Sequence, residues 1–570
     1  VEFDPDETRV EIVFDNPGGL QTGEAVVYDT DGAAIGGLTD GETYYAIVEA
    51  DGRLKLAASR DDAMKGEAIE RTSAASGDAH KLTEAAHSNG ATSVSGASGG
   101  KTSVAGSVAV NVALGETSAL YGETAQLTVT GGGASTVEAK AATYTLTRAL
   151  SAKDTAGKSL GLGLSFAIGV SEHDVLASVA GGATLADFGD LSVSATSDHV
   201  AATQAKAGSV TTATDGTSVG GSLALMVSLN DTEATVPAGT TGLSVDGNLS
   251  VTAAHTLDLL TEADADTKGN TGVGIALGMA WAEDDTRALL GRDVSATGPT
   301  ADDVTVSATS VTTALTVSQG SSQGAKKKQS NGDGTTANEQ SASATGAANQ
   351  QSGATLNDPQ PGSQVQSGNN TAATQTTNPG GQGGNAQQST QQTTGGAVQV
   401  AGAIAATVIV SDAEAVVEDV TINATGDMTV RALNDADASS IATGLALNTS
   451  DGQTGVGAAV AVNVAVLKAQ ATVAAGTIST GSLTVEAGTS DGETNEMQTV
   501  ALAGAGVKQK SNQGGGGTNT NGGLAIAGAA GVNYYESDTD ASIADGATVT
   551  AGSGDVDMTA RQSVGVQNIA

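Results

Sequence analysis

The main pattern in this chain is a short segment that alternates at period two and recurs seven times. One copy reads VAVNVAL over residues 108–114, and another reads VAVNVAV over residues 460–466. An acidic bend follows each copy, and the residue five positions before the bend serves as an anchor. The anchors are Asn111, Gly169, Met226, Gly278, Thr407, Asn463 and Asn533. Their spacing is nearly constant, except between Gly278 and Thr407, where it more than doubles, and before Asn533, where it is slightly longer.

A second segment gives the same period independently. It reads GDLSVSA at 189–195, GNLSVTA at 247–253, GDMTVRA at 426–432 and GSLTVEA at 481–487, with weaker copies around Val137, Val306 and Met558. Both recurring segments indicate a repeat of about 56 residues. The spacing between copies is longer at the same two places for both segments, so the chain has insertions there. A fixed period of this kind predicts a stacked repeat architecture.

The repeated segments predict strands, because they alternate and are rich in Val, Thr, Ala and Gly. We therefore expect an all-β chain, a parallel β-helix (β-solenoid) of seven repeats of about 56 residues with Val/Ala/Leu ladders inside. The two segments lie about half a repeat apart, which favours two coils per repeat, although one wide coil fits as well. With two coils per repeat and strands about 4.8 Å apart, the stack would be a rod of about 70 Å.

The chain divides into five predicted parts. Residues 1–87 form a small all-β module, with a hairpin around EADG at 49–52, and residues 88–101 form a Ser/Gly-rich connection. Repeats one to four occupy 102–318 and repeats five to seven occupy 396–570. Between them, residues 319–395 are rich in Gln, Asn, Gly, Ser and Thr and predict a flexible insertion. Insertions at one phase of a solenoid emerge on one side, which makes that side a candidate interaction edge.

Composition narrows the classes of function. The 570 residues carry a formal net charge of −39, so we expect neither nucleic acid nor an anionic membrane as a partner. There is no Cys, which excludes disulfides and thiolate metal sites. No apolar run reaches membrane-spanning length, so no membrane-spanning segment is expected.

The acidic bend is the candidate cation site. Its residues are Glu116, Asp174, Asp231, Glu283, Asp412 and Asp538, with Lys468 as the exception. Stacked carboxylates repel one another, and Ca²⁺ is a hard cation that binds several oxygens. The best clusters for calcium are Glu283, Asp284 and Asp285; Glu536, Asp538 and Asp540; and Asp29 and Asp31. The alternative is that all of these are solvated turn residues, and the EF-hand spacing is absent.

Basic residues gather in the insertions. Lys326, Lys327, Lys328, Lys508 and Lys510 are candidates for contact with acidic bends on a neighbouring molecule, the alternative being simple solvation of a loop. The five histidines show no metal-ligand spacing, and no catalytic or cofactor-binding residue is predicted.

The repeat segments, together with GLTDGETYY at 37–45 and LKLA at 54–57, resemble those of giant bacterial repeat adhesins, the filamentous haemagglutinin-like and autotransporter-like β-solenoid surface proteins. The resemblance covers nearly the whole chain. It implies an exported, extracellular or cell-surface protein that acts in adhesion, cell-cell contact or matrix. Its expected partners are further copies, end to end or lateral, neighbouring segments of a longer chain, or cell-surface glycans and other cells.

Two functions follow from these patterns. The first is a non-enzymatic structural or adhesive rod, either the stalk of a giant adhesin or a filament subunit. The alternative is a β-helix lyase or hydrolase acting on polysaccharide. Such an enzyme needs acids or bases clustered at one groove, whereas the acids of this chain recur in every repeat and aromatic residues are 2% of it. The pattern therefore favours the rod.

Overall fold

The structure is a computed structural model of the 570-residue chain. It describes residues 87–570 except 130–131, 152–155, 187, 212, 214–215, 296–300, 325–397, 452–453, 509–523 and 553, together with 13–14, 25–30, 34–39, 42–48, 53–58, 63, 68–69 and 80–84. The chain divides into two compact units, one of Val1–Asn89 with Ala141–Tyr144 and one of Gly90–Lys140 with Thr145–Ala570. Both repeat blocks fall in the larger unit, except for Ala141–Tyr144.

The smaller unit contains a five-stranded antiparallel sheet in the order β1-β4-β3-β2-β5. Its strands are β1 (Val13–Phe14), β2 (Ala25–Thr30), β3 (Thr43–Val48), β4 (Leu54–Ala57) and β5 (His80–Glu84). The predicted hairpin is confirmed, because β3 and β4 pair antiparallel on either side of residues 49–53. Tyr28 and Tyr44 are buried, and their hydroxyls accept hydrogen bonds from the backbone N–H groups of Ile35 (3.0 Å) and Thr39 (2.7 Å).

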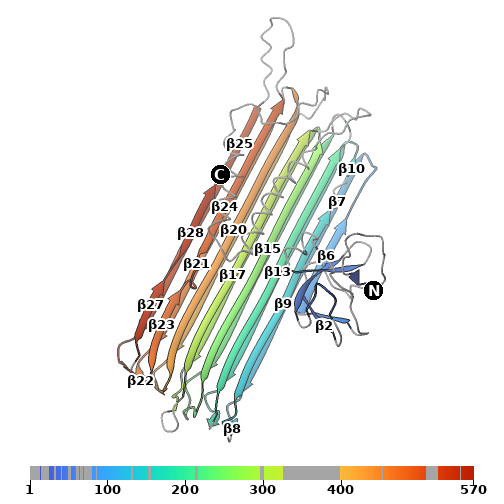
Figure 1. Ribbon diagram of the computed structural model, residues 1–570. Coiled ribbons are helices and arrows are strands. Elements are labelled where there is room, and N and C mark those ends of the chain that lie inside the picture. Colours follow the sequence, from blue (N-terminus) through green and yellow to red (C-terminus); the bar gives the residue numbers. More distant parts are fainter. Residues whose placement is uncertain are drawn as a thin grey trace. The chain divides into compact units, whose positions relative to one another are not determined.

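The larger unit is built from two long parallel sheets (Figure 1). The seven-stranded sheet consists of β7 (Thr102–Tyr121), β11 (Leu160–Val179), β14 (Thr217–Val236), β16 (Thr271–Leu290), β18 (Val398–Val417), β21 (Thr454–Val473) and β25 (Leu524–Ile543). The eleven-stranded sheet consists of β6 (His87–Ser95), β9 (Ser135–Ser151), β10 (Ala156–Gly157), β13 (Leu191–Thr211), β15 (Leu249–Gly269), β17 (Val304–Gly324), β20 (Asp427–Asp451), β23 (Ser482–Gly488), β24 (Asn495–Lys508), β27 (Val556–Arg561) and β28 (Val564–Ile569).

Short strands connect the two long sheets at one end. They are β8 (Gln126–Thr128) paired with β12 (Thr184–Ala186), and β19 (Val420–Asn423), β22 (Gly476–Thr480) and β26 (Ala547–Ala551) in a small sheet of their own. The described residues therefore form an all-β fold whose repeats are parallel β-solenoid coils, as the alternation predicts.

Each repeat is one wide coil, and the interpretation of two coils per repeat is wrong. The first segment of a repeat lies in the seven-stranded sheet and the second lies in the eleven-stranded sheet. Leu160 pairs with Thr102 on one side and Thr217 on the other, so neighbouring coils are one full repeat apart. Seven coils about 4.8 Å apart extend about 30 Å, whereas a 20-residue strand such as β7 extends about 66 Å. The long dimension of the repeats is the strand axis, and the longer stack expected from two coils per repeat is not formed.

Small side chains fill the space between the two sheets, and many of the larger ones lie outside. In β7, Ala105, Ala109 and Asn111 are buried, while Val108 and Val110 on the alternate face are 61% and 55% exposed. For this segment, in the seven-stranded sheet, this reverses the expectation of Val ladders inside the coil. The second segment confirms the expectation, because Val193, Val251, Val306, Val430 and Val485 are buried on successive strands of the eleven-stranded sheet. The reason for the reversal is steric, because Gly, Ala and Ser on the inner faces allow the two backbones to approach closely. A Cβ added to Gly163 would collide with the carbonyl oxygen of Gly208 in the opposite sheet.

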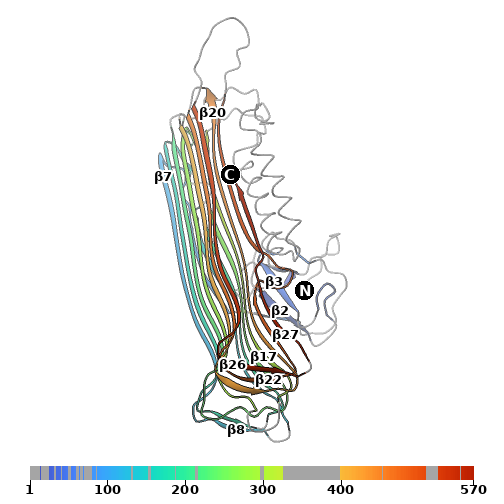
Figure 2. The ribbon, with the colours of Figure 1, turned by 90° about the vertical axis from the view of Figure 1, so that its left-hand side faces the viewer.

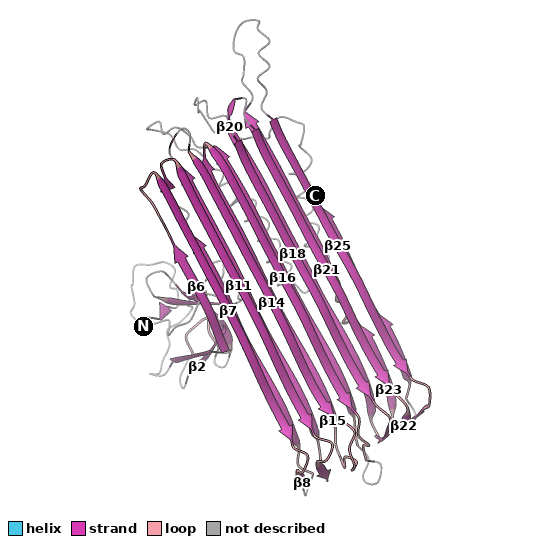
Figure 3. Cartoon of the chain, turned by 180° about the vertical axis from the view of Figure 1, so that it is seen from behind, coloured by secondary structure: helices cyan, strands magenta, loops and turns pink. Residues whose placement is uncertain are grey.

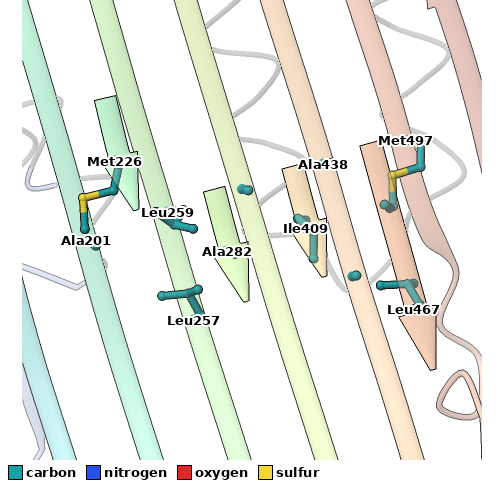
Figure 4. Packing of buried hydrophobic residues seen from close by; sticks show 12 residues of the cluster. Ala201, Met226, Leu257, Leu259, Ala282, Ile409, Ala438, Leu467 and Met497 are labelled. Carbon is teal, nitrogen blue, oxygen red and sulfur yellow. The ribbon is translucent and has the colours of Figure 1, made fainter. Parts of the chain in front are cut away.

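The interior widens toward the short strands (Figure 2). Midway along the strands, larger side chains such as Met226, Leu257, Ile409 and Leu467 pack among alanines from both sheets (Figure 4). Next to the short strands, the buried residues include Leu185 and Phe188. Increasing side-chain volume along the strand therefore sets the separation of the sheets.

A buried arginine connects coils at the end of the larger unit where the interior is widest. Arg292 is 2% exposed and donates to the carbonyl oxygens of Ala180 (2.7 Å) and Ala183 (3.0 Å), two coils earlier. Desolvation lowers the pKa of its guanidinium, and Glu123 acts in the opposite direction. These bonds connect the turn at residues 180–183 to a coil two repeats later.

Strands extend into two regions predicted as irregular. Strand β6 occupies most of the expected Ser/Gly-rich connection at 88–101. Strand β17 continues to Gly324, so residues 319–324 of the expected insertion are strand, and Gln319 and Ser322 within them are buried. Their polar side chains are compatible with a strand because this part of the interior is polar: Ser322 Oγ donates to Gln399 Oε1 at 2.5 Å. The rest of the insertion, 325–395, lies outside the described residues.

Candidate functional surface

An acidic column crosses the outer face of the seven-stranded sheet. The strand register places Glu116, Asp174, Asp231, Asp285, Asp412, Lys468 and Asp538 side by side on successive strands. The assignment of Glu283 to this column is wrong, because Asp285 is the residue that pairs with Asp231 and Asp412. Likewise, Ala280 and not Gly278 is in register with the neighbouring anchors. The acidic bend is thus part of a continuous strand, and a column of carboxylates results.

Partial burial and crowding raise the pKa of three of these carboxylates, those of Asp231, Asp285 and Asp412. The pKa of Asp231 rises to about 6, mainly through desolvation and then through the charges of Glu233, Asp285 and Asp174. Desolvation also raises the pKa of Asp285, with Asp412 the next cause, while Lys468 opposes the rise. Lys468 likewise opposes the rise at Asp412. The single lysine of the column therefore relieves repulsion between its neighbours.

The structure separates the members of the first calcium candidate. Asp284 is fully buried and points between the sheets, whereas Glu283 and Asp285 point outward. Asp284 accepts hydrogen bonds from Asn230 Nδ2 (2.7 Å) and Thr312 Oγ1 (2.6 Å). Alternation along a strand thus prevents the three carboxylates from meeting at one ion.

The other calcium candidates differ in placement. Glu536, Asp538 and Asp540 share the outer face of β25, and Glu536 accepts a hydrogen bond from the hydroxyl of Tyr534 (2.6 Å). Asp29 lies in β2, but its side chain is outside the described residues, and Asp31 is outside them altogether. In the part of the chain that the structure describes, no group of three or more His, Cys, Asp or Glu side chains has a metal-binding arrangement.

The basic candidates cannot be placed on this surface. Lys326, Lys327, Lys328 and Lys510 lie outside the described residues. Lys508 is the last residue of β24, where its backbone pairs with Asp451, and its side chain is not described. Contact between these lysines and an acidic column remains a prediction.

An apolar field lies near the acidic column, separated from it by the one outward-facing column in register with Leu114. We define it as the outward-facing positions on all seven strands in register with Val104, Gly106, Val108, Val110 and Val112. Of the 35 positions (five columns on seven strands), 34 hold an apolar residue or Gly, and the remaining one is Tyr534 on β25, at the edge of the field. The eleven-stranded sheet differs, since its strand β15 directs Ser250, Thr252 and Thr256 outward. Figure 3 shows the seven strands that carry the field as one broad sheet.

A chain of polar contacts lies buried between the sheets and was not predicted. Ser197 Oγ is 2.7 Å from His255 Nδ1, and His255 Nε2 is 3.2 Å from Asp284 Oδ1 without hydrogen-bond geometry. All three side chains are at most 1% exposed, so these residues form a structural contact between sheets with no access for a substrate. The signal in the sequence was the repeat itself, because Ser197 and His255 occupy equivalent positions on adjacent coils.

Two further histidines continue this buried region. The rings of His173 and His199 stack with centroids 4.3 Å apart. Desolvation lowers the pKa of His199 to about 2, and the charges of His173 and His255 act in the same direction. The imidazole of His199 therefore stays neutral, which allows it to stack inside the protein.

The sequence matches no protein-family model, and comparisons with curated proteins and with solved structures gave no match. The described residues contain no helix with the length and apolar character needed to cross a membrane.

Proposed function

We propose that this chain is a non-enzymatic structural and adhesive segment of an exported cell-surface protein. In this role the coils form a rigid support, and the outer face presents the same kind of side chain on every strand. Contacts that are weak individually then act together, because a first contact raises the effective concentration for the next.

The observation that carries the proposal is the unbroken register of the seven-stranded sheet. Thr271 pairs with Val398 although the longest interruption of the repeats separates them in the chain, so the coils stack continuously across it. Because one register holds through all seven coils, the acidic column and the apolar field are both continuous across the sheet. A surface that repeats in this way suits multivalent contact better than a single catalytic pocket.

Both a stalk and a filament subunit remain within the proposal. Strands β7 and β25 are the outermost strands of the seven-stranded sheet, so in the described part of the chain each has one edge without a paired strand. Such edges are templates for another strand. Either a neighbouring segment of the same protein or a second molecule supplies that strand.

The test is an adhesion assay with the purified full chain. Microspheres coated with the protein are mixed with one another and with cells, with and without calcium, and attachment is counted against albumin-coated microspheres. We expect clustering or attachment specific to the protein coat, and a calcium requirement would implicate the acidic column. If the coated microspheres stay dispersed and unattached, and the protein instead depolymerises acidic polysaccharide, the enzymatic alternative replaces the proposal.

A further inference from the structure

The apolar field is open on the surface of the larger unit. Val108 and Ile275 are 61% and 53% exposed, and Met279 and Trp281 near the centre of the sheet are each 41% exposed. Exposure of single apolar residues is ordinary, but a continuous patch of this size without a charged residue indicates an interaction surface.

The apolar field has hollows at glycine positions where the single chain does not require glycine. A Cβ added to Gly106, Gly402 or Gly528 would meet no atom within 4 Å, and none of these glycines has a positive φ. Neither packing nor backbone conformation within the molecule explains glycine there. In the same column, Leu164 and Ile275 project from the intervening strands β11 and β16. Alternating large and absent side chains form knobs and hollows, as in interdigitated sheet packing.

The size of the field matches a stable protein interface. Seven strands about 4.8 Å apart and five columns about 6.7 Å apart cover about 1,100 Å². The largest apolar patch of a typical monomer is about 300–600 Å². Two such faces in contact would bury about 2,200 Å², which is above the roughly 1,600 Å² of a standard interface.

Among the occupants that the chain suggests, a second copy fits best. Residues 319–395 contain only two large aliphatic side chains, Leu356 and Val365, and cannot cover the field with apolar groups. An anionic membrane would be repelled by the nearby acidic column and the net charge of −39. A second apolar field has the same size, flatness and relief.

We propose that the apolar field packs face to face against the apolar field of a second copy of this chain, with the strands of the two copies antiparallel. A two-fold axis allows two such arrangements. With parallel strands, the two acidic columns would lie opposite each other. With antiparallel strands, the acidic column of each copy lies outside the opposing apolar field, beyond the positions of the other copy that are in register with Thr102. Repulsion between like charges therefore selects the antiparallel arrangement.

This inference names the partner for the lateral contact included in the proposed adhesive function, but it is tested separately. Dimerisation is measured in solution, whereas adhesion is measured on microspheres. A dimer without adhesion contradicts the function alone, and adhesion by a strictly monomeric protein contradicts this inference alone.

The first experiment is analytical ultracentrifugation of the full chain and two variants over a range of concentrations. Met279→Glu places a carboxylate on the middle strand of the field, one column from its centre, and Thr256→Glu places one on the exposed outer face of the other sheet. We expect a wild-type dimer, an unchanged dimer for Thr256→Glu, and a dissociation constant raised roughly a hundredfold or more for Met279→Glu, because the new charge would be buried without a partner. Circular dichroism checks that both variants fold.

A wild-type monomer at all concentrations would overturn the proposal, as would a dimer unaffected by Met279→Glu. Flotation of a monomeric wild type with phosphatidylcholine vesicles would assign the field to a lipid surface instead.

The second experiment tests strand orientation and uses the absence of Cys in the chain. Val108→Cys introduces one thiol on β7, and Ala530→Cys introduces one in the same column on β25. In the antiparallel arrangement β7 lies opposite β7, so a short bis-maleimide should join two Val108→Cys molecules. In the parallel arrangement β7 lies opposite β25. Cross-linking only in a mixture of the two variants would overturn the antiparallel orientation.

Discussion

At the scale of the residue, two aspartates accept backbone hydrogen bonds at a place where the strand ladder is interrupted. Strands β23 and β24 both pair with β20, and residues 489–494 between them leave the ladder. The backbone N–H of Ser490 donates to Asp435 Oδ1 (3.0 Å), and that of Glu496 donates to Asp437 Oδ1 (2.7 Å). The carboxylates thus accept hydrogen bonds from donors next to the break.

One of these aspartates makes stability depend on pH. Desolvation raises the pKa of Asp437 to about 7, and nearby acids add to the rise, while the hydrogen bond from Glu496 opposes it. Because its pKa is raised on folding, Asp437 contributes stability at a pH below about 4, and that contribution is lost as the pH rises through 7. Asp437→Asn should therefore stabilise the protein by about 2–4 kcal/mol at pH 8 and have little effect at pH 4.

Urea unfolding at both pH values measures this difference. The exposed Asp419→Asn is the control and should change the free energy of unfolding by less than about 0.5 kcal/mol at either pH. An equal effect of Asp437→Asn at pH 4 and pH 8 would contradict the assignment.

At the scale of the element, close contact between the two sheets requires glycine at some positions whose Cβ would point inward, toward the opposite sheet. It does not require glycine where the Cβ would point outward. A Cβ on Gly320 of β17 would collide with the carbonyl oxygen of Gly402 in β18. A Cβ on Gly402 itself would point into open space. Two glycines that face each other therefore have opposite requirements.

Their alanine variants form a matched pair. We expect Gly320→Ala to destabilise the protein by about 2 kcal/mol or more, because a backbone carbonyl must move. Gly402→Ala should be stabilising by about 0.4–1 kcal/mol, because it restricts the unfolded chain without strain. Urea midpoints at low protein concentration measure both effects, and equal effects for the two variants would contradict the close packing.

At the scale of the whole molecule, the charge of −39 is unevenly distributed. Six of seven positions in the acidic column are carboxylates, and Lys468 lies between Asp412 and Asp538. Lys468 Nζ is also 4.0 Å from Glu414 Oε1, at the outer limit of an ion pair. Added salt should therefore raise the thermal midpoint, because it screens repulsion within the column.

Lys468→Glu should increase this dependence on salt. The exposed Lys158→Glu changes the net charge by the same amount, from −39 to −41 (−39 − 2), but lies outside the acidic column. We expect a lower midpoint at low salt for Lys468→Glu, with most of the loss recovered at about 0.5 M NaCl, and a small change for Lys158→Glu. If the two variants behave alike, net charge and not the column governs stability.

The sequence alone determined the strands, the seven repeats and the parallel stacking, because alternation and a fixed period are local properties of the chain. It also indicated six of the seven positions of the acidic column, and missed Asp285 because two neighbouring acids made the register ambiguous. Tertiary structure decided that each repeat is one coil, since nothing local distinguishes one long strand from two short ones. It also decided that Ala109 lies inside and Val110 outside. Alternation predicts two faces, but only the close approach of a second sheet decides which side chains have room in the interior.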